Sequence, residues 1–281
     1  MEQFCDLHTH SLFSDGTYTP AQLIDAAVEA GLAALALTDH NTVDGIADFL
    51  AAGEGKPIEV IPGIEFSVDY DGTELHLLGL YLPSESLPGI SALMEDFIRR
   101  KEESSRALVE ALNKAGYEIS YEKILAATGS GYVNRAHIAA ALTEQGYTAS
   151  VKEAFSKLLR PEAGYYIPPR RPDVWEMIGY IRSIHAVPVL AHPFLNLTDA
   201  QLTVFLPEAK KLGLVGMECF YSTYDAQTTH RSLELADAYG LLYSGGSDFH
   251  GAVKPDISLG WGKGDLRIPL SWAEALKGAI E

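Results

Sequence analysis

The feature that most constrains the fold is a repeated pattern in which a short apolar run is followed by a segment with helical periodicity. Continuous apolar runs stand at 32–37 (LAALAL), 187–191 (VPVLA) and 214–220 (LVGMECF). Runs of this length are typical of strands that are buried on both faces. Because such runs alternate with helical patterns, the sequence predicts an α/β fold with a largely parallel sheet or barrel.

Helices are expected between these runs. Thr19-Pro20 is typical of a helix start, and an apolar stripe follows it until Gly31. Further helices are predicted at 43–52, 198–211 and 226–239. Additional strands are expected at the N-terminus and at 58–65, 74–81 and 241–250.

The middle of the chain has a different pattern. From about Pro88 to Pro172 it is mostly helical, and Asn134 is a candidate N-cap for a helix running to Gln145. We therefore predict three segments, with 1–87 and 173–281 forming the α/β domain. Residues 88–172 are predicted to form a helical insertion that serves as a substrate-binding cap.

The charge and the apolar content exclude some classes of partner. The 38 acidic and 21 basic residues give a net charge of −17, which disfavours binding to duplex nucleic acid or an anionic membrane. No apolar run approaches the ~18 residues of a membrane span, and no basic-then-apolar leader is present. Cys5 and Cys219 both lie in apolar runs. We expect core thiols and a cytoplasmic protein.

Polar residues that could bind metal gather at or near the ends of the predicted strands. They are His8, His10, Asp15, His40, Glu65, His76, His192, Asp248 and His250. Barrel strands direct their carboxyl ends to one mouth, so six imidazoles and three carboxylates would converge there. Such ligands suit Zn²⁺, Mn²⁺ or Fe²⁺, and nine are too many for one tetrahedral ion. The pattern predicts two or three ions, with Glu65 as a bridge.

Three other histidines fall inside predicted helices. His185 and His230 are expected to have structural or surface roles, whereas His137 stands in a motif considered below.

Six motifs together resemble those of the PHP (polymerase and histidinol phosphatase) phosphoesterases. They are DLHTHSLFSDG, LTDHNTVDG, PGIEFS, ELHLLGLY, VLAHP and GGSDFHG. The resemblance implies a distorted β/α (TIM-like) barrel with a trinuclear centre of divalent ions, expected to be Mn²⁺, with Zn²⁺ or Fe²⁺ as alternatives. By similarity, His8, His10, Glu65 and Asp248 would hold one ion; Glu65, His76 and His192 a second; and Asp15, His40 and His250 a third.

The layout is similar to small stand-alone PHP members with a helical insertion. Such members act on nucleoside 3′,5′-bisphosphates, on the 5′ ends of short RNA, or on cyclic phosphates of phosphoribose. The stretch NRAHIA, 134–139, resembles their helix start that meets a substrate phosphate, which implies roles for Arg135 and His137. Arg170 and Arg171 offer further planar donors for a second phosphate.

The expected chemistry is hydrolysis of a phosphate ester. A metal-bound hydroxide would be the nucleophile, and the ions would neutralise charge in the transition state. His192, Asp39 or a metal-bound water could protonate the leaving group, and the sequence leaves this choice open.

The favoured substrate is a small 5′-phosphorylated ribose compound, either a cyclic diester or a nucleoside 3′,5′-bisphosphate. Alternatives are 5′–3′ exonuclease action on short RNA and a histidinol-phosphate-type phosphatase. A non-enzymatic metal-binding module is the alternative from another class.

Overall fold

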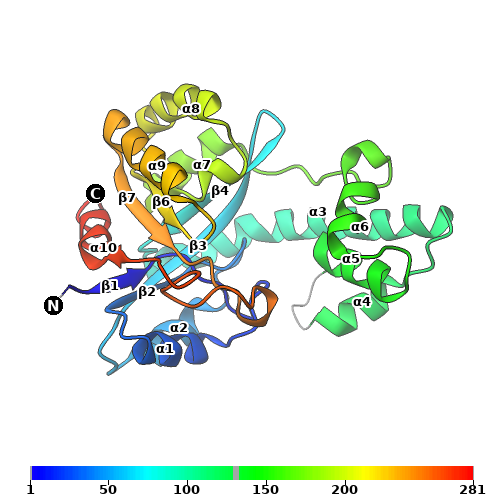
Figure 1. Ribbon diagram of the computed structural model, residues 1–281, viewed down its shortest axis with the longest axis horizontal. Coiled ribbons are helices and arrows are strands. Elements are labelled where there is room, and N and C mark those ends of the chain that lie inside the picture. Colours follow the sequence, from blue (N-terminus) through cyan, green and yellow to red (C-terminus); the bar gives the residue numbers. More distant parts are fainter. Residues whose placement is uncertain (1, 129–132, 281) are drawn as a thin grey trace. The chain divides into compact units, whose positions relative to one another are not determined.

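The computed structural model describes residues 2–128 and 133–280. The chain forms two compact units, each with its own apolar core. The first, here called the barrel unit, consists of Met1–Ser91 and Pro172–Glu281, and the second, the helical unit, is Ala92–Arg171. Figure 1 shows the strands in the barrel unit and only helices in the described part of the helical unit.

One eight-stranded sheet forms the centre of the barrel unit, in the order β7-β6-β5-β4-β3-β2-β1-β8. The strands are β1 (Phe4–Asp6), β2 (Ala34–Leu37), β3 (Glu59–Tyr70), β4 (Thr73–Leu80), β5 (Val187–Leu190), β6 (Gly216–Tyr221), β7 (Leu242–Gly246) and β8 (Ile268–Pro269). Beyond β1 and β7 the backbone continues to pair, because Leu7 N donates to Gly245 O (3.2 Å) and Asp248 N donates to His8 O (2.9 Å). The sheet thus nearly closes into a barrel, and the predicted α/β barrel is confirmed.

The direction of β4 differs from a purely parallel barrel. Strands β1, β2 and β3 are parallel, as are β5, β6 and β7, but β4 is antiparallel to both of its neighbours. A two-residue turn joins β3 to β4, with Asp71 and Gly72 at φ values of 49° and 83°. Positive φ at both positions is typical of the hairpin turns whose twist matches the strands.

Two polar residues of this hairpin lie at positions other than those expected from the sequence. Glu65 was expected at the end of a strand but lies in the middle of β3, since β3 continues to Tyr70. His76 lies in the first half of β4, where Ala191 N donates to its carbonyl oxygen at 3.0 Å. Because β4 runs in the opposite direction, its beginning reaches the edge where β5 ends.

Helices cover the outside of the barrel unit. They are α1 (Pro20–Glu29), α2 (Ile46–Gly53), α7 (Val174–Ser183), α8 (Asp199–Lys211), α9 (Ala226–Tyr239) and α10 (Leu270–Lys277), with 3₁₀ turns at Ser84–Ser86, Pro193–Leu195 and Gly251–Val253. The predicted start of α1 is confirmed: the Thr19 hydroxyl accepts from Gln22 N, and the Gln22 side chain accepts from Thr19 N. Two helices pack together against one side, α1 and α2 (Figure 1).

The barrel interior has an apolar layer and a polar layer. Residues such as Ala36, Ile61 and Val189 form the apolar core and are fully buried. Cys5 and Cys219 are free thiols without exposed surface, which confirms that both belong to the core. The polar layer contains fully buried acids and histidines at the carboxyl ends of the parallel strands, and it is described below.

The helical unit has its own core, built where four helices meet. They are α3 (Leu87–Lys114), most of which lies in this unit, α4 (Tyr121–Thr128), α5 (Arg135–Glu144) and α6 (Val151–Lys157), followed by a 3₁₀ turn at Pro161–Ala163. Leu108, Leu112 and Ile138 are buried in this core. Asn134 caps α5 as predicted, since its side chain accepts from His137 N at 2.9 Å.

Among the described residues, no helix is both long and apolar enough to cross a membrane.

Candidate metal centre

Glu65 lies at the centre of the polar layer and contacts five imidazoles. Its Oε1 atom lies 2.8 Å from His76 Nδ1 and 3.0 Å from His192 Nε2. Its Oε2 atom lies 3.0 Å from a nitrogen of His40, 3.2 Å from one of His8 and 3.3 Å from one of His10. The carboxylate is completely buried. A single side chain therefore joins five histidines from four segments of the chain.

Two aspartates extend this cluster. Asp248 Oδ1 lies 3.2 Å from His10 Nε2 and 3.3 Å from His250 Nδ1. Asp15 Oδ1 lies 3.2 Å from His250 Nε2, and Asp15 Oδ2 lies 4.0 Å from His40 Nε2. The structure thus brings all nine residues proposed from the sequence into one connected cluster.

The donor atoms form groups of the kind that hold a metal ion. Within each group the ligand atoms lie within 4.8 Å of one another: His10, Asp15, His40 and His250; His8, His10 and Glu65; His40, Glu65 and His76; and His8, His192 and Glu218. The first three groups overlap with the sets implied by the family resemblance. Each pair of these groups has one residue in common, which is His10, His40 or Glu65. The fourth includes Glu218, which the sequence analysis did not single out.

Several donor atoms are buried and make no hydrogen bond to the described residues. They are His8 Nε2, both ring nitrogens of His10, Glu65 Oε2 and His192 Nδ1. His8 Nε2 and Glu65 Oε2 lie only 3.2 Å apart, yet they do not have hydrogen-bond geometry. Buried polar atoms without partners cost free energy. Divalent cations would satisfy these atoms, and imidazole with carboxylate is a donor set that suits Mn²⁺, Zn²⁺ or Fe²⁺. The residues therefore fit a multi-metal centre.

The electrostatics of the cluster keep its carboxylates ionised. Burial by itself raises the pKa of Glu65, but His40, His8 and His76 outweigh it and hold the pKa well below its usual range. Burial lowers the pKa of His10, and the neighbouring His250 and His40 lower it further, so this ring stays neutral. A neutral ring among ionised carboxylates is in the state that binds a cation.

Asp39 supports the loop that carries two of the candidate ligands. Its Oδ1 accepts from Ser11 N (2.7 Å) and from the Ser14 hydroxyl (2.6 Å), and its Oδ2 accepts from the Ser11 hydroxyl (2.6 Å). Ser11 and Ser14 lie between His10 and Asp15. Burial raises the pKa of Asp39, which three hydrogen bonds to the two serines counteract. Its contacts are thus those of a residue that shapes the loop.

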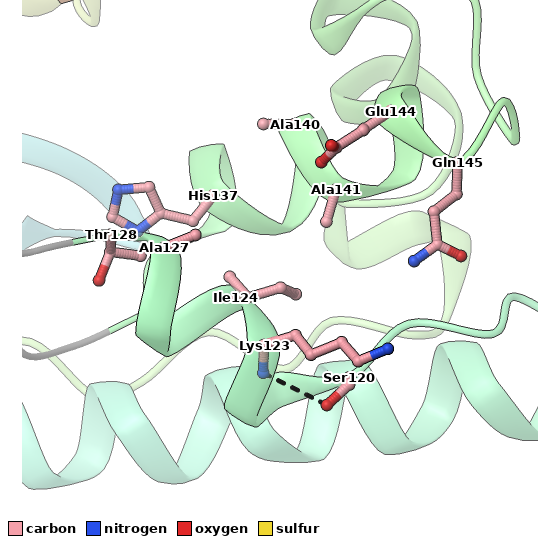
Figure 2. Close-up of a pocket in the computed structure, with 10 residues that line it drawn as sticks. All are labelled: Ser120, Lys123, Ile124, Ala127, Thr128, His137, Ala140, Ala141, Glu144 and Gln145. Carbon is pink, nitrogen blue, oxygen red and sulfur yellow. Dashed lines mark hydrogen bonds between the residues drawn. The ribbon is translucent and has the colours of Figure 1, made fainter.

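The four substrate-binding candidates belong to the helical unit, whereas the nine metal candidates belong to the barrel unit. The Arg135 guanidinium lies over the Tyr166 ring, with 4.6 Å to its centroid. His137 lines a cavity of about 500 Å³ between α4 and α5, where Figure 2 shows it beside Thr128 and Ala127. Arg170 is exposed and Arg171 is half-buried.

The remaining histidines lie at the surface. The His230 side chain is 76% exposed and 3.3 Å from Glu234, as expected. His185 is exposed too, but it follows the end of α7 at a φ of 59° instead of lying inside a helix.

Among the residues that contact the candidate ligands, the sequence analysis missed Glu218, Tyr221 and Lys254. Glu218, on β6, lies between His8 and His192. Tyr221 and Lys254 both donate to Asp248 Oδ2, at 2.7 Å and 2.6 Å. One signal was available for Glu218, because an acid inside the apolar run LVGMECF must be buried with a partner.

Comparison with known proteins assigns the chain to a family. The PHP domain family matches residues 6–167, more than half of the chain. The chain belongs to the PHP family. It is accordingly a phosphoric ester hydrolase of the metal-dependent type, in agreement with the resemblance seen in its motifs.

Three curated relatives cover most of the PHP protein's length. A phosphoribosyl 1,2-cyclic phosphate 1,2-diphosphodiesterase from Eggerthella lenta is 33% identical and covers 88% of this chain and 94% of its own. A 5′-3′ exoribonuclease from Haemophilus influenzae is 30% identical, covering 87% and 89%. A 3′,5′-nucleoside bisphosphate phosphatase from Chromobacterium violaceum is 29% identical, covering 87% and 86%.

Two solved structures share the fold over almost the whole chain. A proposed metal-dependent phosphoesterase from Bifidobacterium adolescentis has a TM-score of 0.82 at 28% identity, covering 99% of this chain and 97% of its own. An amidohydrolase from C. violaceum, with bound sulfate and no metal, has a TM-score of 0.83 at 27% identity with the same coverage.

Proposed function

We propose that this PHP protein hydrolyses a phosphate ester of a small 5′-phosphorylated ribose compound. The substrate is either a cyclic phosphodiester of phosphoribose or the 3′-phosphate of a nucleoside 3′,5′-bisphosphate. The observation that carries the proposal is the connected cluster of nine ligand residues around Glu65. Two relatives whose names specify these two substrate types support the choice of ligand.

In this proposal the cluster holds three divalent ions, with Glu65 shared between two of them. His8, His10, Glu65 and Asp248 bind one ion; Glu65, His76 and His192 bind another; and Asp15, His40 and His250 bind the third. When bound, such ions supply Lewis acidity and positive charge toward a phosphoryl group. Mn²⁺ is the ion that we propose to test first.

The side chains of the barrel unit prepare this site. The low pKa values of Glu65, Asp15 and Asp248 maintain negative charge where cations are needed. Because His192 is a ligand of the second ion in this proposal, we assign it no role as the group that protonates the leaving oxygen. Its Nε2 lies 3.0 Å from Glu65 Oε1, and its backbone has an unusual φ of 28°. We propose that Asp39, already engaged by Ser11 and Ser14, holds the loop and does not transfer a proton.

The helical unit provides the candidates for binding the remote part of the substrate. We propose that Arg135, with His137 and one of the arginines at 170–171, binds the phosphate that does not react. A guanidinium binds phosphate through parallel charge-assisted hydrogen bonds.

A second candidate function is exonuclease action on short 5′-phosphorylated RNA. The exoribonuclease from H. influenzae, similar over 87% of this chain, favours it. The net charge of −17 disfavours it, because a polymer of phosphates would be repelled outside the metal site.

The test is a comparison of substrates with Mn²⁺-reconstituted protein. Phosphoribosyl 1,2-cyclic phosphate, adenosine 3′,5′-bisphosphate, a 5′-phosphorylated RNA tetramer and histidinol phosphate would be assayed at equal concentration, with Asp248→Asn as the inactive control. We expect one of the first two to have the highest kcat/KM. A higher kcat/KM for the tetramer would support the exonuclease, and one for histidinol phosphate would contradict both.

A further inference from the structure

Glu218 contacts two of the candidate metal ligands, His8 and His192, on the side away from Glu65. It lies on β6 and its side chain has no exposed surface. Its Oε1 atom lies 3.0 Å from His8 Nδ1, and its Oε2 accepts a hydrogen bond of 2.7 Å from the backbone N–H of His192. Both carboxylate oxygens are therefore used on the side of the ligands that faces away from Glu65.

The contact with His8 determines which ring nitrogen faces the centre. A carboxylate only accepts hydrogen bonds, so a His8 ring that binds a metal ion through one nitrogen must carry its proton on Nδ1, the nitrogen that faces Glu218. The other nitrogen, Nε2, is then a lone-pair donor, and it lies 3.2 Å from Glu65 Oε2 and 3.8 Å from Asp248 Oδ1. Nε2 is buried and without a hydrogen bond, which is the state expected of a ligand atom.

The contact with His192 holds an unfavourable backbone conformation. His192 has a φ of 28°, in the region that non-glycine residues rarely adopt. Such strain persists only where surrounding contacts stabilise it. The hydrogen bond to Glu218 is one such contact, and it fixes the ring that lies 5.5 Å from the His8 ring in a stacked arrangement.

We propose that Glu218 is a positioning residue of the metal centre, which sets the His8 tautomer and the His192 backbone at the same time. We assign it no ion of its own in this proposal, since its Oε1 faces His8 Nδ1 and its Oε2 accepts from the backbone N–H of His192. This inference rests on the proposed metal centre. Removal of a carboxylate that orients a ligand histidine in this way typically weakens metal binding by 10- to 100-fold.

Replacement of Glu218 by glutamine separates this role from simple packing. Glutamine has the same shape, but it offers one acceptor oxygen and one NH₂ group. If the NH₂ group faces His8, the ring must carry its proton on Nε2 and loses its lone pair toward the centre. If the NH₂ group faces His192, two donors meet and the strained backbone relaxes. Either orientation removes one ligand.

The matched control is Asp6→Asn. Asp6 is also a fully buried acid whose oxygens accept only from N–H and O–H groups. These donors are the Ser247 hydroxyl (2.5 Å), Ser247 N (2.8 Å), Gly260 N (2.8 Å) and, more weakly, His8 N (3.3 Å). It contacts no imidazole nitrogen in these hydrogen bonds. The same chemical change at Asp6 should therefore destabilise the fold without changing the tautomer of a ligand histidine.

The experiment measures Mn²⁺ affinity by chelator competition and the Tm of the metal-free protein, for wild type, Glu218→Gln and Asp6→Asn. We expect Glu218→Gln to bind the weakest ion at least ~10-fold less tightly, while Asp6→Asn lowers Tm and keeps wild-type affinity. Wild-type affinity in Glu218→Gln, with or without a lower Tm, would overturn the inference and leave the metal centre standing. Failure of the wild type to bind Mn²⁺ would instead overturn the proposed function.

Discussion

Lys254 neutralises Asp248 from the side opposite the histidines. Its Nζ lies 2.6 Å from Asp248 Oδ2, whereas Asp248 Oδ1 faces His10 Nε2 at 3.2 Å. Burial raises the pKa of Asp248, but His10, His8 and Lys254 outweigh it and hold the pKa well below its usual range. Lys254 thus supplies a positive charge at Asp248 that belongs to the chain itself and does not depend on a bound metal ion.

Lys254→Met should destabilise the metal-free protein more than the Mn²⁺-loaded protein. Without metal, Asp248 loses its permanent counter-charge, and since the Lys254 side chain is 38% exposed the cost is about 1 kcal/mol, or a Tm lower by ~3 °C. With Mn²⁺ bound, the ions would stabilise the same carboxylate. Lys263→Met, at an exposed position in the same segment, should change neither Tm. An equal loss with and without Mn²⁺ would show that Lys254 acts only through packing.

A pH prediction follows from His76. Burial lowers its pKa, but Glu65 outweighs burial and raises the pKa to about 10 in the metal-free protein. The folded pKa lies above the unfolded value of about 6.5, so the stabilisation is complete below pH ~6.5 and is lost as pH rises through about 10. The Tm of metal-free protein should therefore decrease between pH 7 and 10, and decrease less in His76→Gln.

The same protonation couples metal binding to pH. His76 carries a proton at pH 7 in the metal-free protein, and a metal ion must displace it. Mn²⁺ affinity should therefore increase from pH 6 to 8, with proton release detectable by calorimetry in buffers of different ionisation enthalpy. Affinity that is independent of pH over this range would contradict the assignment of His76 as a ligand.

The nine residues of the cluster could be found from the sequence because each has a local signal. His192 directly follows the apolar run 187–191, and His40 comes three positions after the run 32–37. Such runs are buried strands whose ends meet at one mouth. The hairpin of β3 and β4 could also have been predicted from the sequence. Asp71-Gly72 between two strand-like segments is a strong indication of a two-residue turn.

The supporting residues could not be found in the same way. Glu218 is 210 positions from His8 along the chain, and Lys254 contacts Asp248 through a loop that has no regular period. Their partners depend on how β1, β6 and β7 come together in the barrel, which no short motif encodes. An acid within an apolar run shows that a partner exists, but it does not identify the partner.

Glu65→Gln should abolish the metal centre. Glu65 contacts five imidazoles within 3.3 Å, and an amide at this position has half the acceptor capacity and no charge. We expect less than one Mn²⁺ per chain by elemental analysis, and a fall in kcat/KM of at least ~100-fold. Glu59→Gln is the control, since Glu59 begins the same strand but pairs with Lys277 at the surface. Retention of two or more ions in Glu65→Gln would exclude Glu65 as the bridging ligand.

Arg135→Ala tests whether the helical unit binds the phosphate that does not react. An interaction with a remote phosphate contributes equally to the ground state and the transition state, so its loss raises KM and leaves kcat nearly unchanged. A charge-assisted hydrogen bond contributes about 1.5–3 kcal/mol, which corresponds to a roughly 10- to 100-fold rise in KM for a ribose bisphosphate. The rise should be much smaller for an analogue that lacks the remote phosphate.

The control for Arg135→Ala must lose a comparable packing contact. Arg135 lies over the Tyr166 ring at 4.6 Å, and Arg106 lies over the Tyr121 ring of the same unit at 3.8 Å. Arg106→Ala therefore removes a guanidinium–aromatic contact without removing the proposed phosphate donor. We expect both variants to lower Tm by a similar amount and only Arg135→Ala to raise KM for the bisphosphate. If KM rises equally for both substrates, or equally in both variants, Arg135 stabilises the helical unit and another residue binds the remote phosphate.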